Sequence, residues 1–318
     1  MDLPTPIHPA YAAINEARKK LPLMSDIPLD QIRKNMDKRG AAVPVPDVLE
    51  EDKVVDMDDK SLKLTLLRPL GTESEMLPAV IYYKGGGFML GSKYTHGKII
   101  RDICTKSRVA IVFIDYSLAP EVKFPVIHEE CYATLQWVLQ HGKDINVDTS
   151  KLAVCGDSAG GNLALAIPLM AKQRGLGDVI KAQIAYYPVT ASSNRERFQS
   201  YQEFGNGDYP LSRQDVERVE DQYFNGDGGD KKWAAPLLAS IDELRDLPPA
   251  LIMTAEADLL RDEAEEYGRK LTEAGVKAAT VRLIGGVHGM VIQYVETPIY
   301  LQSLAMIKQQ LDEAFERQ

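Results

Sequence analysis

The chain has few cysteines, no long apolar run and no excess of basic residues. Its three cysteines, Cys104, Cys131 and Cys155, are odd in number, lack metal-ligand spacing and fall in apolar stretches. Buried, reduced thiols are therefore expected. No apolar run approaches the about 20 residues that span a bilayer. The formal net charge of −9 argues against nucleic acid or an anionic membrane surface as a partner.

Residues 1–9 also lack the basic and apolar segments of a secretory signal. Together with reduced thiols, this favours a cytoplasmic location. The 318 residues, 45% of them hydrophobic, can bury a large core, either as one domain or as a domain with a small appendage. The oligomeric state stays open, a homodimer included.

Residues 1–50 differ in pattern from the rest of the chain. Two amphipathic helical stretches, near 10–20 and 29–39, precede a Pro-rich linker at 43–46. Such a segment is suited to form a helical cap. A hairpin is expected next, with strands at 53–57 and 61–68 and its turn at 58–60.

Residues 51–318 alternate apolar strands with helices. Strands are expected at 79–83, 109–115, 152–155, 182–187, 250–255 and 279–284. Helices are expected at 97–107, 129–140, 162–174, 263–274 and from about 298. Continuous apolar strands of this kind form a parallel sheet covered on both faces. The sequence therefore predicts an α/β domain with a mostly parallel sheet of about eight strands, and residues 190–232 look like an insertion above it.

Residues 156–160 read Gly-Asp-Ser-Ala-Gly and lie between an apolar strand and a helical stretch. In this setting the pattern predicts a nucleophile elbow, where glycines permit a sharp turn that exposes the serine hydroxyl. The first N–H groups of the following helix point toward negative charge that develops there. Ser158 is the candidate nucleophile.

A serine hydroxyl needs a histidine to take its proton near neutral pH. The chain has five histidines. Four of them, His8, His96, His128 and His141, lie in the Pro-rich terminus or at helix ends, which favours structural or surface roles. His288 follows a buried strand, where parallel-sheet enzymes place reactive groups. It is the candidate base.

Two carboxylates, Glu256 and Asp258, follow the strand at 250–255. Either would give the order Ser, acid, His that is typical of α/β-hydrolases. The sequence pattern favours Asp258 and leaves Glu256 open. The alternative for both residues is a solvated loop carboxylate or a helix cap.

Three consecutive glycines, residues 85–87, follow the strand at 79–83. They allow backbone N–H groups to approach a substrate oxygen, and such donors contribute several kcal/mol at a developing oxyanion. The alternative is an ordinary glycine turn. Together with the elbow and the histidine after a strand, the pattern favours an oxyanion hole.

With these motifs the chain resembles the hormone-sensitive-lipase-like family of α/β-hydrolases, in the branch with a Gly-Asp-Ser-Ala-Gly elbow. The resemblance runs from about residue 78 to the C-terminus. Its landmarks are residues 84–88, 115–121, 124–125, 156–162, 248–251, 257–263 and 288–289. It implies an α/β-hydrolase fold with flanking helices and an N-terminal helical cap, and an activity of the carboxylesterase or lipase type.

The resemblance also implies roles for the acidic residues. The family's catalytic acid is the aspartate of a D-x-L-R-D-E string, which favours Asp258 over Glu256. Asp262 and Glu263 would then be structural, and Asp157 would be a local hydrogen-bonding residue.

One position departs from the family pattern. Lys84 stands where the family usually has the histidine of H-G-G-G. A charged lysine cannot accept a hydrogen bond, so it cannot copy that histidine fully. Its side chain would point to solvent, pair with a carboxylate, or place a cation near the pocket and favour an acidic or polyoxygenated substrate.

The expected function is a serine carboxylic-ester hydrolase that works through an acyl-enzyme. Ser158 would attack the ester, His288 would move the proton, and Asp258 would hold His288. The oxyanion would bind to the N–H groups of Gly85, Gly86 and Ala159. No cofactor or metal is expected, and the resemblance implies small-molecule esters with short to medium acyl chains. The alternatives are a pathway-specific lactonase, thioesterase or deacetylase, and a non-catalytic receptor of the same fold.

Overall fold

The computed structural model describes residues 5–20, 27–57, 60–225 and 231–317. Most of the predicted hairpin turn, at 58–59, lies outside this part of the chain. None of the helices within the described residues has the length and apolar character needed to cross a bilayer.

Eight strands form one sheet in the order β1-β2-β4-β3-β5-β6-β7-β8. Strand β2 pairs antiparallel with β1 and β4, and all other pairs are parallel. The prediction of a mostly parallel sheet of eight strands is confirmed. The strands are β1 (Leu49–Met57), β2 (Lys60–Arg68), β3 (Leu77–Tyr83), β4 (Ala110–Ile114), β5 (Val147–Asp157), β6 (Ile180–Tyr186), β7 (Ala250–Ala257) and β8 (Ala278–Val287).

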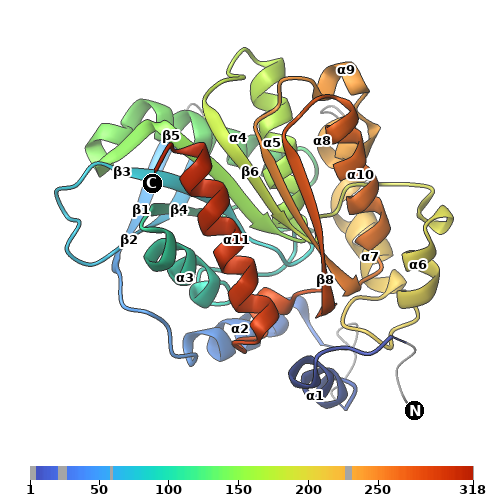
Figure 1. Ribbon diagram of the computed structural model, residues 1–318. Coiled ribbons are helices and arrows are strands. Elements are labelled where there is room, and N and C mark those ends of the chain that lie inside the picture. The colour runs from blue at the N-terminus through green and yellow to red at the C-terminus, as the bar shows by residue number, and fades with distance from the viewer. Residues whose placement is uncertain (1–4, 21–26, 58–59, 226–230, 318) are drawn as a thin grey trace.

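Helices cover both faces of the sheet, which explains why its central strands are apolar throughout. In β3, Val80 and Tyr82 belong to one core cluster, while Ile81 and Tyr83 belong to the cluster on the opposite face. Helices α3 (Gly97–Ser107) and α11 (Pro298–Ala314) cover the first face. Helices α4 (Val126–His141), α5 (Ala159–Gln173) and α10 (Arg261–Glu273) cover the second (Figure 1).

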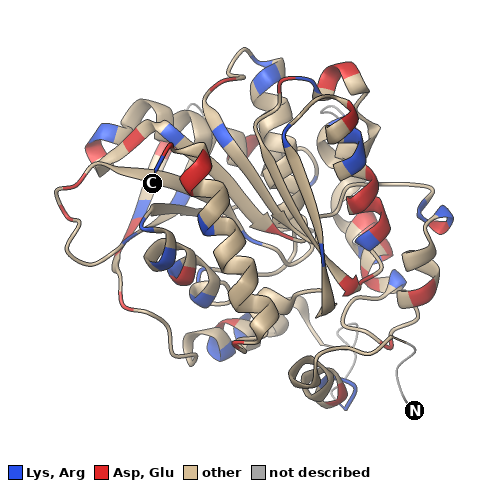
Figure 2. Cartoon of the chain, in the orientation of Figure 1, with Lys and Arg blue, Asp and Glu red and all other residues tan. Residues whose placement is uncertain are grey.

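Charged side chains follow this layering. Figure 2 shows lysine, arginine, aspartate and glutamate spread over the outer helices and loops, while the central strands are almost free of them. The three cysteines lie inside these layers and are fully buried as free thiols, as predicted. Burial raises the pKa of Cys104 to about 12, so this thiol stays protonated and unreactive at neutral pH.

In its described residues, the long connection from β6 to β7 carries the short α-helices α6 (Gln199–Phe204), α7 (Arg213–Val219), α8 (Lys231–Ala234) and α9 (Ile241–Leu244). Helix α1 (Pro9–Arg18) contacts this connection, where Asn15 donates a hydrogen bond to the Asp208 carbonyl at 2.7 Å. Helix α2 (Leu29–Ala41) and α1 both lie beyond the edge where the parallel strands end (Figure 1). Strand β1 begins at Leu49, at the end of the predicted cap segment 1–50.

The N-terminal segment is also joined to the core. Tyr11 of α1 is 1% exposed and belongs to a core cluster with sheet residues, and its hydroxyl lies 2.8 Å from Thr297 Oγ1. Ile32 of α2 packs into the cluster on the opposite face. The N–H of His8 donates to the carbonyl of Gly285, which places α1 beside the loop that carries His288.

Candidate active site

Ser158 occupies a strained turn between β5 and α5. Its φ and ψ are 56° and −117°, a conformation that is costly for a residue with a side chain and that clusters at functional sites. The glycines on either side are required by close packing. A Cβ at Gly156 would lie 2.2 Å from the Gly160 carbonyl oxygen, and one at Gly160 would lie 1.9 Å from the Tyr83 carbonyl oxygen. This geometry is that of a nucleophile elbow.

A chain of hydrogen bonds joins the three predicted residues. Ser158 Oγ lies 2.8 Å from His288 Nε2, and His288 Nδ1 lies 2.7 Å from Asp258 Oδ2. The second carboxylate oxygen of Asp258 accepts a 3.0 Å hydrogen bond from the N–H of Leu260. The Asp258 carboxylate accepts a hydrogen bond from Nδ1–H, which leaves the Nε2 lone pair free to accept one from the serine hydroxyl. The arrangement can activate Ser158 for attack on a carbonyl.

Glu256, the other candidate acid, lies at the end of β7 and contacts the backbone of β8. Its Oε2 accepts a 2.7 Å hydrogen bond from the N–H of Gly285, and its backbone carbonyl accepts one from Arg261. The carboxylate therefore holds the end of β8 just before His288, and within the described residues no hydrogen bond joins it to the imidazole. This arrangement favours Asp258 as the residue that orients His288.

The remaining histidines have local partners that fit structural roles. His8 accepts a hydrogen bond from the Ala10 N–H at the start of α1, and His141 pairs with Asp144 near the end of α4. His128 is fully buried beside Tyr223, and burial lowers the pKa of His128 to about 4. The ring of His128 is thus neutral at physiological pH.

The N–H group of Gly85, predicted as an oxyanion donor, points into the protein. It donates to Asp157 Oδ1 and to His96 Nε2, each at 3.1 Å. Because both acceptors are buried protein atoms, this N–H is turned away from any substrate oxygen, which counts against Gly85 as an oxyanion donor. The same contacts bear out the local hydrogen-bonding role expected for Asp157, which also accepts the Tyr82 hydroxyl. Although burial alone would raise the pKa of Asp157, His96 and these donors hold it below its usual value.

Three other N–H groups near Ser158 are free of protein acceptors. Within the described residues, no acceptor pairs with the backbone N–H of Gly86, Gly87 or Ala159. Gly86 and Gly87 have φ of 111° and 60°, values that favour glycine and let the loop turn its N–H groups. The connection between β6 and β7 packs on this loop, since the rings of Phe88 and Tyr223 stack at 4.4 Å between centroids.

Lys84 points into the protein. Its side chain is fully buried, and its Nζ lies 3.6 Å from the centroid of the Tyr116 ring and 4.0 Å from Asp115 Oδ1. Within the described residues, Nζ has no hydrogen-bond acceptor. The Tyr116 hydroxyl donates to the Lys84 carbonyl at 2.6 Å, and this hydrogen bond holds the start of the glycine loop. Of the three expected placements, a contact with a carboxylate fits best, and no part of the side chain is exposed to a substrate pocket.

We expect the charge on Lys84 to destabilise the fold at neutral pH. Burial lowers the pKa of Lys84 from 10.5 to about 8, and the Asp115 charge offsets this in part. Below the folded-state pKa, Lys84 is charged, and the free-energy cost of burying its ammonium group is fully present. As pH rises further the unfolded state binds more protons, so the free energy of unfolding increases. Between roughly pH 7 and pH 10 the free energy of unfolding of the wild type should increase by about 2 kcal/mol relative to that of Lys84→Met.

Denaturant unfolding of both proteins at the two pH values measures this change. Other groups titrate alike in wild type and variant, so the difference between them isolates Lys84. A difference that stays constant with pH would mean that Lys84 keeps an ordinary pKa in the folded protein.

Comparison with known proteins agrees with this geometry. A family model described as the α/β-hydrolase fold matches residues 80–292. The chain belongs to the α/β-hydrolase family. Its relatives place it in the hormone-sensitive-lipase-like carboxylesterase group, as the motifs predicted.

Several relatives and solved structures are named as esterases. A protein named ethyl acetate hydrolase, from Pseudomonas putida, is 31% identical over 85% of each chain. A protein named carboxylesterase NlhH, from Mycobacterium tuberculosis, is 36% identical over 68% of this chain and 67% of its own length. A fungal esterase structure from Rhizomucor miehei superposes with a TM-score of 0.93, at 45% identity over 98% of both chains.

Proposed function

We propose that this α/β-hydrolase is a serine carboxylic-ester hydrolase whose nucleophile is Ser158. The observation that carries the proposal is the Ser158–His288–Asp258 chain of hydrogen bonds, at 2.8 Å and 2.7 Å, on the strained elbow. Relatives and similar structures named as esterases support the reaction class.

In the proposed mechanism, Ser158 Oγ attacks the acyl carbonyl while His288 Nε2 takes its proton. His288 then gives that proton to the leaving alcohol, and an ester bond joins the acyl group to Ser158. Water attacks this acyl-enzyme with His288 again acting as base, which releases the acid and restores the serine hydroxyl. Asp258 holds Nδ1–H throughout and stabilises the imidazolium.

The oxyanion is proposed to bind at the N–H groups of Gly86, Gly87 and Ala159. Their lack of protein acceptors supports this set, and the internal bonds of Gly85 argue for leaving it out. The dipole of α5, whose first residue is Ala159, adds a favourable field at the same point. Preorganised donors of this kind stabilise the tetrahedral intermediate more than the planar substrate.

The proposed substrates are small-molecule esters with short to medium acyl chains. We propose that α1, α2 and the connection from β6 to β7 together form the cap over the acyl site. The stacking of Phe88 on Tyr223 and the contact of α1 with the connection support this arrangement.

A fluorophosphonate probe tests the proposed function. An activated Ser158 should become labelled in the wild type, and p-nitrophenyl esters of increasing acyl length should be hydrolysed with a maximum at short to medium chains. A wild-type protein that neither reacts with the probe nor cleaves any of these esters would support a non-catalytic receptor instead.

Removing the N-terminal part of the cap should change acyl preference and lower stability. Deleting residues 1–46 takes away the buried side chains of Tyr11 and Ile32, each worth roughly 1.5–3 kcal/mol, so the melting temperature should fall by about 10 °C. The truncated protein should still react with a small fluorophosphonate, because Ser158, His288 and Asp258 all lie outside the deleted segment.

The ratio of kcat/KM for octanoate and acetate esters measures the change in preference. An unaltered ratio would show that α1 and α2 do not line the acyl site. A truncated chain that is wholly insoluble would show that the segment completes the core.

A further inference from the structure

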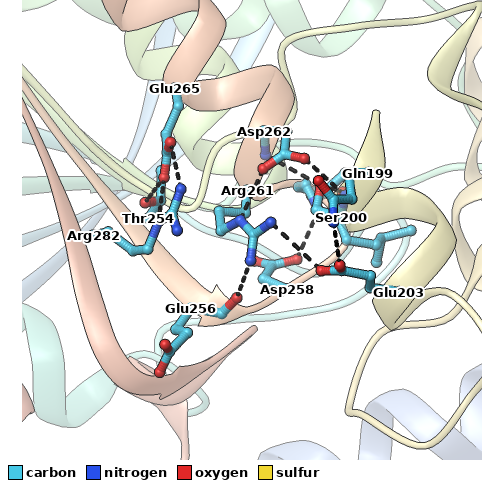
Figure 3. Close-up of polar contacts among 12 residues, drawn as sticks. Gln199, Ser200, Glu203, Thr254, Glu256, Asp258, Arg261, Asp262, Glu265 and Arg282 are labelled. Carbon is cyan, nitrogen blue, oxygen red and sulfur yellow. Dashed lines mark hydrogen bonds and ion pairs between the residues drawn. The ribbon is translucent and has the colours of Figure 1, made fainter. Parts of the chain in front are cut away.

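The turn that directly follows Asp258 is bound to helix α6 of the β6–β7 connection through one buried serine, Ser200. Ser200 is fully buried, and its hydroxyl donates to the Leu259 carbonyl at 2.9 Å. The same oxygen accepts the Asp262 N–H at 3.2 Å, and the Ser200 N–H donates to Asp262 Oδ2 at 2.7 Å. Figure 3 shows Ser200 and Asp262 facing each other across this contact. The serine thus fixes both ends of the turn 259–262.

The same turn holds the Asp258 carboxylate. The Leu260 N–H donates to Asp258 Oδ1 at 3.0 Å, and the Arg261 N–H donates to the Asp258 carbonyl at 3.1 Å. Leu260 lies between the two positions that Ser200 fixes. If Ser200 moved or lost its hydroxyl, the Leu260 N–H would shift, and the carboxylate that it orients would rotate relative to His288.

Arg261 makes a second link between α6 and this region. Its guanidinium bonds to Asp262 Oδ1 at 2.8 Å and to the Glu256 carbonyl at 3.1 Å, and it lies 3.7 Å from Glu203 Oε2 (Figure 3). Since Glu203 belongs to α6 and Glu256 to the end of β7, Arg261 joins the connection to the strand before the acid. The position of α6 is therefore coupled to the turn from both sides.

We propose that Ser200 is a positioning residue for Asp258, through which the placement of α6 sets the strength of the Asp258–His288 hydrogen bond. The inference rests on the proposed roles of Asp258 and His288. It assigns to the β6–β7 connection a part in the rate of the reaction in addition to covering the acyl site.

The pH dependence of the reaction reports on the Asp258–His288 hydrogen bond. His288 is faced by the Asp258 carboxylate and, at 4.8 Å between ring centroids, by Tyr187. Burial raises the pKa of Tyr187 well above its usual value, so that phenol stays neutral. A looser Asp258 stabilises the imidazolium less, which moves the acid limb of the pH profile to lower pH.

The test compares Ser200→Ala with Ser212→Ala. Ser200→Ala should lower kcat about tenfold with KM changed by less than about twofold, because a small misplacement of a catalytic group acts mainly on the transition state. The acid limb of its kcat/KM profile should move to lower pH. Ser212 caps α7 of the same connection through Asp215, and among the described residues it has no hydrogen bond to residues 258–262. Ser212→Ala should therefore keep both kcat and the pH profile.

Equal losses of kcat in the two variants, or a loss in Ser200→Ala with an unmoved acid limb, would overturn the proposal and leave Ser200 a structural residue. If Ser200→Ala does not fold, Asp262→Asn can be used instead, because it weakens the same contact. This variant must then show a lower kcat with nearly unchanged KM, and an acid limb that moves to lower pH. Fluorophosphonate labelling of the wild type separates the two proposals. An unlabelled wild type means that the proposed function has failed, whereas a labelled wild type with an unaffected Ser200 variant means that only the positioning role has failed.

Discussion

Ser158→Ala is expected to lower kcat by about 10⁶ and to abolish fluorophosphonate labelling, since no other group can form the acyl-enzyme. The hydroxyl lies 2.8 Å from His288 Nε2, so the two residues are expected to act as a unit. His288→Ala should therefore cost nearly as much, and the double variant Ser158→Ala/His288→Ala should be no more than a few-fold slower than either single variant. Initial rates on a p-nitrophenyl ester measure all three.

Ser150 provides a matched control for this prediction. It lies on the same strand β5 but is exposed, and its hydroxyl bonds to Asp148. Ser150→Ala should hydrolyse the ester at the wild-type rate. Near-normal activity in Ser158→Ala would contradict the mechanism, and losses that multiply in the double variant would show that Ser158 and His288 contribute independently.

The sequence predicted those parts of the site that depend on local spacing. Gly156 and Gly160 flank Ser158 because the elbow leaves no room for a Cβ, and this requirement is visible as a pentapeptide. His288 follows directly after β8, so its position could be inferred from strand order and from the small number of histidines. The parallel sheet was likewise predictable, because strands buried on both faces are apolar without alternation.

The direction of backbone groups could not be predicted in the same way. Three consecutive glycines indicate a loop that approaches the substrate, but they do not tell which N–H faces outward. The Gly85 N–H is turned inward by His96 and by Asp157, which is 72 residues away along the chain. The expected oxyanion set of Gly85, Gly86 and Ala159 follows from the sequence, and only the tertiary partners of Gly85 argue against that one donor.

The surroundings of Lys84 depend on tertiary contacts as well. Lysine is rarely buried without a partner, so its sequence position gave no reason to expect a fully buried ammonium. The Tyr116 ring that covers it comes from the loop after β4. In the same way, the pattern of residues 1–50 indicated a cap that precedes a Pro-rich linker, while Tyr11 and Ile32 pack into core clusters with strands far along the chain.

Asp258→Asn is expected to lower kcat by about 10⁴ near neutral pH. An asparagine has one oxygen, and the Leu260 N–H and His288 Nδ1–H both need an acceptor at this position. If the oxygen stays with Leu260, the amide N–H₂ faces His288 and forces its proton onto Nε2. That tautomer donates to Ser158 and cannot accept its proton.

Glu256→Gln is the matched control, because it makes the same carboxylate-to-amide change two residues away. The glutamine oxygen can still accept the Gly285 N–H, so kcat should stay within about threefold of the wild type, as expected when a neutral acceptor replaces a charged one in a single part-buried hydrogen bond. Both variants should keep the wild-type melting temperature within a few degrees, so that a difference in kcat reflects chemistry. A large loss in Glu256→Gln with little loss in Asp258→Asn would make Glu256 the acid. That outcome would require the end of β8 at Gly285 to rearrange during the reaction, because in this structure Glu256 accepts the Gly285 N–H while Asp258 reaches the imidazole.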